Sequence, residues 1–217
     1  MSLQVWRKSA FILAIIGAIQ FIILLGIAMV FYAGGNIVNP SAPGYSIWLN
    51  SWSDLGRTVA WSGKNNLTSQ VLFSIAMVVW GISFVPSIQA LPSLFSESKR
   101  GKLFTKIGSI SAVICVVFLL INVFLFPVDL HPYLHGILAI LGYLAFLIVE
   151  ILFAIVMFWD DNYPNTRATC FLAVAIVIII FLITNAAILQ KTVSITFIIA
   201  TVIVFSSAWK TTTQKES

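Results

Sequence analysis

Charged side chains are scarce in this sequence. Asp, Glu, Lys and Arg make up 9% of its 217 residues, whereas a soluble domain contains about 25%. Hydrophobic residues make up 60% of the chain, and the mean hydropathy is +1.04. A chain of this length cannot cover so much apolar surface in water. The composition therefore excludes a soluble globular protein and indicates a protein integral to the cell membrane.

The sequence also lacks residues that several kinds of membrane protein require. No lysine falls inside the apolar runs, which excludes a retinal Schiff base, and no run carries the row of arginines of a voltage sensor. The only two histidines share one segment and cannot ligate stacked haems. Walker, G-x-S-x-G and HExxH motifs are absent. Cys115 and Cys170 form no CxxC pair and fit small core residues.

Six long apolar runs are present. They predict an all-α polytopic bundle that forms one membrane domain over residues 1–217, because about 20 residues suffice to cross the hydrocarbon core. We place the spans at about 11–32, 68–95, 107–126, 134–159, 168–189 and 192–209.

The basic residues predict the orientation of the bundle. One side has Arg57, Lys64 and Lys191, and the other side has nine Lys and Arg: Arg7, Lys8, Lys99, Arg100, Lys102, Lys106, Arg167, Lys210 and Lys215. The positive-inside rule places both termini in the cytoplasm, which agrees with an even number of spans. Because the basic residues flank spans, the net charge of +5 does not indicate a nucleic-acid partner.

The first outer loop, residues 33–67, is much longer than the others. Tyr45, Trp48, Trp52 and Leu55 recur at the spacing of one helical face. This pattern predicts a short helix that lies in the membrane surface or caps the bundle. Long structured loops commonly carry function.

The third outer loop contains both histidines. His131 and His135 lie at i and i+4, so a helix would present both rings on one face, with Asp129 nearby and Asp54 on the same membrane side. His131, His135 and Asp129 could serve as zinc ligands, and the cluster could instead bind a ligand or protons near neutral pH. A third interpretation is structural, with each ring bonded to backbone at a helix start.

Glu150 is the only charged residue within the predicted spans. Pro86 and Pro92 interrupt the second span and free backbone carbonyls one turn earlier. A protonated Glu150 could donate to Gln89, to Gln20 or to a freed carbonyl, which is the structural interpretation. The functional interpretation is a proton or substrate site, because an ionisable residue at this depth is costly.

Several short motifs carry a family resemblance. They are Pro43-Gly44-Tyr45-Ser46, Trp52-Ser53-Asp54-Leu55-Gly56, Val71-Leu72-Phe73-Ser74 before Gly81, and Phe126-Pro127 before Asp129 and His135-Gly136. Together they resemble the uncharacterised six-pass prokaryotic family called domain of unknown function 998. More remotely, they are similar to the eukaryotic six-pass group that includes GPI-anchor lipid-remodelling and autophagy-modulating proteins. The resemblance implies no established activity. It does imply that Ser53, Asp54, Gly56, Asp129 and His135 form one constellation on the outer face.

The leading functional hypothesis is a pocket between the first and third outer loops that binds a lipid headgroup or a similar amphiphile. We expect Ser53 and Asp54 to pack there against Asp129, His131 and His135. A second hypothesis is a metal- or His-assisted lipid hydrolase or acyl transferase, with His135 as base or ligand and Asp129 or Asp54 orienting it. A third is a small proton-coupled transporter that uses Glu150.

Overall fold

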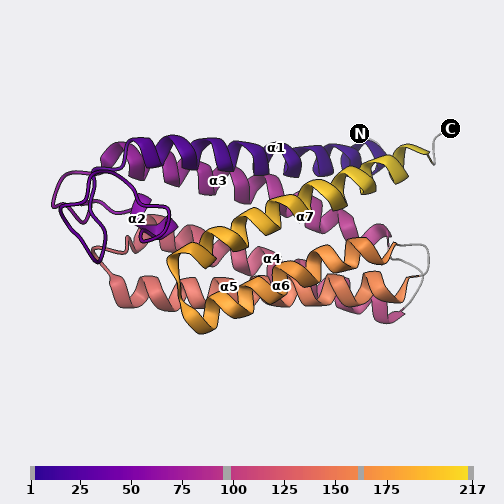
Figure 1. Cartoon of the computed structure of the whole chain (residues 1–217). Coiled ribbons are helices and arrows are strands. Elements are labelled where there is room, and N and C mark those ends of the chain that lie inside the picture. The colour runs from indigo at the N-terminus through magenta and orange to yellow at the C-terminus, as the bar shows by residue number, and fades with distance from the viewer. Residues whose placement is uncertain (1–2, 95–98, 161–163, 215–217) are drawn as a thin grey trace.

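The structure is a computed structural model that describes residues 3–94, 99–160 and 164–214, and these residues are helical apart from their loops. Six long helices lie side by side along one axis (Figure 1). Each is long and apolar enough to cross a membrane, so the prediction of six spans is confirmed. They are α1 (Leu3–Val30), α3 (Leu67–Ala90), α4 (Lys99–Leu125), α5 (Pro132–Trp159), α6 (Asn165–Thr184) and α7 (Ala187–Gln214).

Helices α1 and α4 begin before the predicted apolar spans, in segments that contain basic residues. The first two turns of α1 contain Arg7 and Lys8, which were predicted to precede the first span. The first two turns of α4 contain the basic residues between Lys99 and Lys106, which were predicted to lie in a loop. After α3 a short 3-10 helix, η1, covers Leu91–Leu94. Residue 95, where the second span was predicted to end, and Lys215 lie outside the described residues.

The last two spans meet earlier in the chain than predicted. Helix α6 ends at Thr184, because Asn185 takes a left-handed conformation with φ of 49° and donates its N–H to the carbonyl of Phe181 at 2.7 Å. Asparagine tolerates this conformation, which commonly ends a helix. Helix α7 consequently begins at Ala187, and Lys191 lies within it, not in an outer loop as predicted.

The two ends of the bundle differ. The start of α1 and the end of α7 lie together at one end (Figure 1). The other end, which we name the loop end, is covered by residues 31–66 with the short helix α2 (Trp52–Leu55) and by the connections 126–131 and 185–186. The loop end therefore gathers the segments on which the candidate site residues were predicted.

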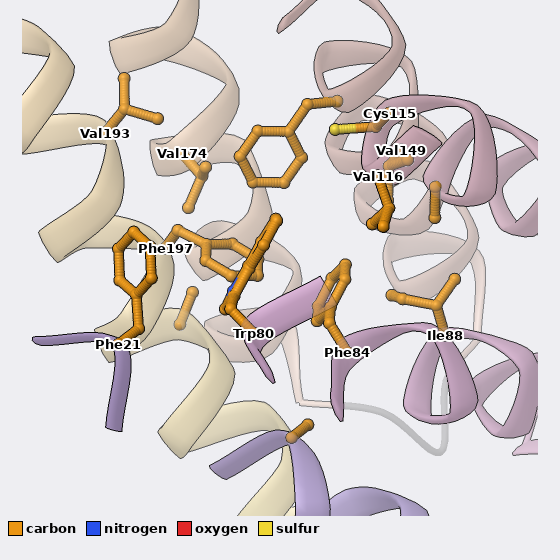
Figure 2. Packing of buried hydrophobic residues seen from close by; sticks show 14 of the residues in the cluster. Phe21, Trp80, Phe84, Ile88, Cys115, Val116, Val149, Val174, Val193 and Phe197 are labelled. Atoms are coloured by element: carbon orange, nitrogen blue, oxygen red, sulfur yellow. The ribbon is translucent and has the colours of Figure 1, made fainter. Parts of the chain in front are cut away.

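Small and aromatic side chains fill the interior of the bundle. In α1 the buried positions are mainly alanine, glycine and phenylalanine, whereas Ile16, Ile19 and Ile23 face outward. Figure 2 shows the rings of Phe21, Trp80, Phe84 and Phe197 gathered between helices. The Phe84 and Phe197 ring centroids are 5.0 Å apart. In lipid, packing of small residues replaces the hydrophobic drive between helices, and this sorting follows that rule.

Helices α1 and α3 lie close together at Gly17. A Cβ atom on Gly17 would lie 2.4 Å from the Cβ of Ser83. One turn further along, the side-chain amide of Gln20 donates to the carbonyl of Ala76 at 3.1 Å. The close approach of the two helices at this crossing therefore depends on the absence of a side chain at Gly17.

We predict that Gly17→Val lowers the melting temperature of the purified protein, because the new side chain forces the helices apart. The expected cost is about 1–3 kcal/mol. Gly26→Val is the matched control, since a Cβ on Gly26 meets nothing within 4 Å. Thermal unfolding in detergent measures both, and equal melting temperatures for the two variants would contradict the packing described.

Candidate functional site

Helix α2 is shorter than the predicted loop helix. It covers four residues, and Ser51 and Asp54 form a capping box at its N-terminus. Trp48 is 72% exposed, whereas Trp52 and Leu55 are buried. The side chain of Asn50 accepts the N–H of Ser46 at 2.9 Å and folds the preceding residues into turns. Local side-chain hydrogen bonds of this kind compete with helix formation, and the periodicity alone did not show it.

Asp54 binds its own loop. One carboxylate oxygen accepts the Trp61 indole N–H at 2.8 Å, and the other accepts the Asn50 amide at 3.1 Å and the Ser51 N–H at 2.9 Å. Arg57 lies 3.8 Å away. Asp54 is buried and these donors occupy both of its oxygens. It therefore organises the loop and does not contact His131, His135 or Asp129 through a hydrogen bond.

Polar residues at the start of α7 hold α2 in place. Gln190 accepts the backbone N–H of Trp52 at 2.8 Å, and Ser194 accepts the Trp52 indole N–H at 3.1 Å. The Lys191 ammonium donates to the carbonyl of Asn50 and lies 5.4 Å from the ring centroids of Tyr45 and Trp52. Sequence reasoning missed this anchor; its signal was a Gln-Lys pair beside an otherwise apolar span.

Asp129 ties the first loop to the connection between α4 and α5. Its carboxylate accepts the backbone N–H groups of Thr58 and Val59 at 3.0–3.1 Å, together with the Thr58 hydroxyl. Partial burial alone would raise the pKa of the Asp129 carboxyl, but these hydrogen bonds lower it below its ordinary value. The group therefore fixes the loop as a carboxylate.

The two histidines have different surroundings. His131 is exposed before the first turn of α5, makes no side-chain cap and sets its ring edge-on to Phe126. His135 is partly buried, and its Nε2 lies 3.0 Å from the Ser53 hydroxyl oxygen. Its Nδ1 lies 2.8 Å from the carbonyl of Phe126. Because a carbonyl only accepts, Nδ1 carries the hydrogen, and in the neutral ring Nε2 accepts the hydroxyl of Ser53.

A cavity of about 90 Å³ lies beneath α2, inside the bundle. Aromatic and aliphatic side chains form most of its wall. Its polar wall residues are Ser53, Asn122, His135, Tyr143, Gln190 and Ser194. The amide nitrogen of Asn122 donates to the carbonyl of His135 at 3.1 Å. Its amide oxygen is buried and has no hydrogen-bond partner among the described residues.

A wider groove of about 640 Å³ lies between the loop and the ends of α5, α6 and α7. Trp48, Arg57 and Trp61 line it on the loop side, and the Arg57 guanidinium lies 4.1 Å from the Trp61 ring centroid. Groove and cavity share a wall made of Ser53, His135, Ala139, Tyr143 and Gln190. The hydrogen-bonded pair of Ser53 and His135 thus stands between the two spaces.

The predicted zinc ligands are not brought together. In the parts of the chain that the structure describes, no group of three or more His, Cys, Asp or Glu side chains could hold a metal ion. His135 faces Ser53 and Phe126, Asp129 faces Thr58 and Val59, and His131 is exposed. The zinc site therefore stays a prediction.

Glu150 lies fully buried in α5, and neither carboxyl oxygen has a hydrogen-bond partner among the described residues. The groups that were predicted to bind it have other partners or face outward. Gln20 binds the carbonyl of Ala76, and Gln89 is exposed. The carbonyl of Ile88, which Pro92 frees, accepts the hydroxyl of Ser109 at 3.0 Å. The predicted hydrogen bonds of Glu150 are therefore wrong, and Glu150 lines neither the cavity nor the groove.

Comparisons of the chain with protein-family models, with curated proteins and with solved structures found no match. The resemblance to the six-pass family thus stays a prediction that depends on the motif residues.

We predict that the stabilising effect of Asp129 depends on pH. Its folded pKa lies below the ordinary value of about 3.9, so its contribution is fully present above that value and is lost as the pH falls through the folded pKa. Melting temperatures of the wild type and Asp129→Asn, measured from neutral to acid pH, should differ most at neutral pH and converge in acid. A difference that stays constant over the range would contradict this assignment.

Proposed function

We propose that this protein binds an amphiphilic membrane molecule in the groove and cavity at the loop end. The observation that carries the proposal is the shared wall, in which Ser53, His135, Tyr143 and Gln190 separate a wide groove from a mainly apolar cavity. A ligand with one polar and one apolar part matches both spaces. Ligand pockets commonly combine apolar walls with a few convergent polar groups in this way.

The volumes divide the ligand into two parts. The cavity of about 90 Å³ is smaller than the engineered cavity of roughly 150 Å³ that holds benzene, so it accepts only a short apolar group. The groove of about 640 Å³ lies within the usual range of roughly 300–1,000 Å³ for small-molecule sites. The groove therefore takes the larger part of the ligand.

The polar wall favours a ligand that carries a hydrogen-bonding group beside its apolar part. Ser53, His135 and Gln190 line both the groove and the cavity, and ligand sites commonly combine apolar walls with a few such polar groups. Hydroxyl and amine groups are common in lipid headgroups and at their glycerol or sphingoid backbones.

The rim of the groove favours a ligand drawn from the membrane. Ile37 and Trp48 line the groove and are 70% and 72% exposed. Exposed apolar side chains beside a transmembrane bundle suit the interfacial layer, where tryptophan is enriched. The positive-inside rule favours a non-cytoplasmic position for this rim, so we propose a lipid or lysolipid of the outer leaflet as the ligand.

We predict that cysteines at the two ends of the bundle label from opposite sides. In a variant without Cys115 and Cys170, Lys64→Cys should react with a membrane-impermeant maleimide in intact cells. Lys102→Cys should react only after permeabilisation. Both lysines are exposed, Lys64 in the loop and Lys102 in α4. The reverse pattern would overturn the proposed orientation.

We predict that Ala139→Phe weakens binding of myristoyl-lysophosphatidylcholine at least about tenfold, which corresponds to about 1.4 kcal/mol. Ala139 lies in the wall that groove and cavity share, so a larger side chain there takes up space that the ligand would occupy. Native mass spectrometry of the purified protein, titrated with this lysolipid, measures the change.

Gly26→Phe is the matched control, because Gly26 is exposed on α1 and a Cβ there meets nothing within 4 Å. It should bind within about twofold of the wild type, a free-energy difference below about 0.5 kcal/mol. Equal affinities of the wild type and Ala139→Phe would count against the proposed site.

A further inference from the structure

We propose that Ser53 is a nucleophile and His135 its general base, and that they act on a carboxylic ester of the bound amphiphile. This inference rests on the proposed function, because the groove and cavity must first hold the ester. It adds a reaction to a binding site, and it requires neither a metal nor Asp54 or Asp129 as a direct partner of the imidazole.

The geometry of the pair meets the requirement for an activated hydroxyl. A nucleophile and its base must lie within hydrogen-bond reach, about 2.6–3.2 Å, and a third group must orient the base. Ser53 Oγ and His135 Nε2 are 3.0 Å apart. The carbonyl of Phe126, 2.8 Å from Nδ1, fixes the tautomer that leaves the Nε2 lone pair toward the hydroxyl.

The backbone around His135 is also held. Asn122 of α4 donates to the carbonyl of His135 at 3.1 Å, and the His135 N–H donates to the carbonyl of His131 at 2.9 Å.

Ser53 differs from the other hydroxyl residues of the loop. The hydroxyl of Ser51 caps α2, and that of Ser62 donates to the carbonyl of Ala33. In the first turn of α3, the hydroxyl of Ser69 donates likewise to the carbonyl of Leu55. Such bonds complete the fold. Among the described residues of the loop, Ser53 is the serine whose hydroxyl meets an imidazole. A serine that served only the fold would more commonly bind a backbone carbonyl.

Ser53 is also accessible to a ligand. Its side chain is half-buried and lines both the groove and the cavity. An ester carbonyl that sits at the shared wall therefore places its two substituents in different spaces. The cavity takes a short part of the apolar substituent, and the groove takes the rest of the amphiphile.

The reaction follows from these positions. Ser53 Oγ bonds to the ester carbonyl carbon while His135 Nε2 takes its proton. The bond from that carbon to the alcohol oxygen then breaks, and the leaving alcohol takes the proton from Nε2, which leaves an acyl ester on Ser53. Water attacks that ester and gives a proton to Nε2, and Oγ leaves and recovers the proton. The sum is one ester and one water converted to one acid and one alcohol.

The direct test uses an alkyl fluorophosphonate and the intact wild-type protein in nanodiscs. Ser53 Oγ attacks phosphorus and fluoride leaves, so a stable adduct should appear on the peptide that contains Ser53, as mapped by mass spectrometry. Ser53→Ala should abolish the adduct. His135→Gln should slow its formation at least about 100-fold, the lower limit for a general base. Ser62→Ala, which alters a structural serine outside the groove and cavity, should label like the wild type.

A second measurement separates the reaction from binding. Wild-type protein should bind myristoyl-lysophosphatidylcholine and hydrolyse p-nitrophenyl octanoate. Ser53→Ala should lose the hydrolysis, and Ser62→Ala, which lies outside the groove and the cavity, should keep it. Wild-type protein that binds the lysolipid but gives no adduct on Ser53 would overturn the nucleophile and leave the binding function standing. Wild-type protein that fails to bind the lysolipid would overturn the proposed function itself. If Ser53→Ala does not fold, adduct mapping on the wild type decides alone.

Discussion

The attachment of Trp52 to α7 is the interaction on which the loop end depends. Its backbone and indole N–H groups bind Gln190 and Ser194, and Lys191 binds the neighbouring carbonyl of Asn50. Each such bond contributes about 0.5–1.5 kcal/mol, and leaving a buried donor unpaired costs more. Because these bonds join the loop to a membrane-spanning helix, they fix the height of α2 above the bundle. That height sets the roof of the cavity and the position of Ser53.

The acidic residues of the loop end serve to join segments. Asp54 closes the turn around α2, and Asp129 holds Thr58 and Val59 against the connection between α4 and α5. Both carboxylates are used in hydrogen bonds that join segments. Other polar side chains of the loop end, such as Ser53 and His135, line the groove. This division explains how one short segment, Ser53-Asp54, contributes one residue to the architecture and its neighbour to the candidate site.

Much of the architecture could be predicted from the sequence, because the length of an apolar run has a direct physical meaning in a bilayer. The six spans follow from these lengths, and so does the long loop of residues 33–67 between the first two spans. The junction between α6 and α7 did not, since it depends on the backbone conformation of Asn185. For the same reason Lys191 was predicted in an outer loop. Its hydrogen bond to the loop from within α7 was therefore not predicted.

The site was accessible to sequence reasoning only in part. Ser53 and His135 could be placed on one side of the membrane, but their pairing depends on how the loop folds back across the bundle. The direction of each carboxylate depends on N–H groups from turns that have no periodic signature, such as those of Trp61 and Val59. Glu150 is recognisable in the sequence as the charged residue within a predicted span. The residues around its side chain depend on which helix faces pack together, and this was not predictable from the sequence.

The acceptor that orients His135 is a main-chain atom, the carbonyl of Phe126 just beyond the end of α4. Every amino acid supplies the same carbonyl, so replacing the side chain at this position leaves the acceptor in place. An insertion in the first turn of α5, between Pro132 and His135, would instead move the imidazole by about 100° around the helix axis. During divergence, this turn should therefore tolerate exchanges of side chain far better than insertions or deletions.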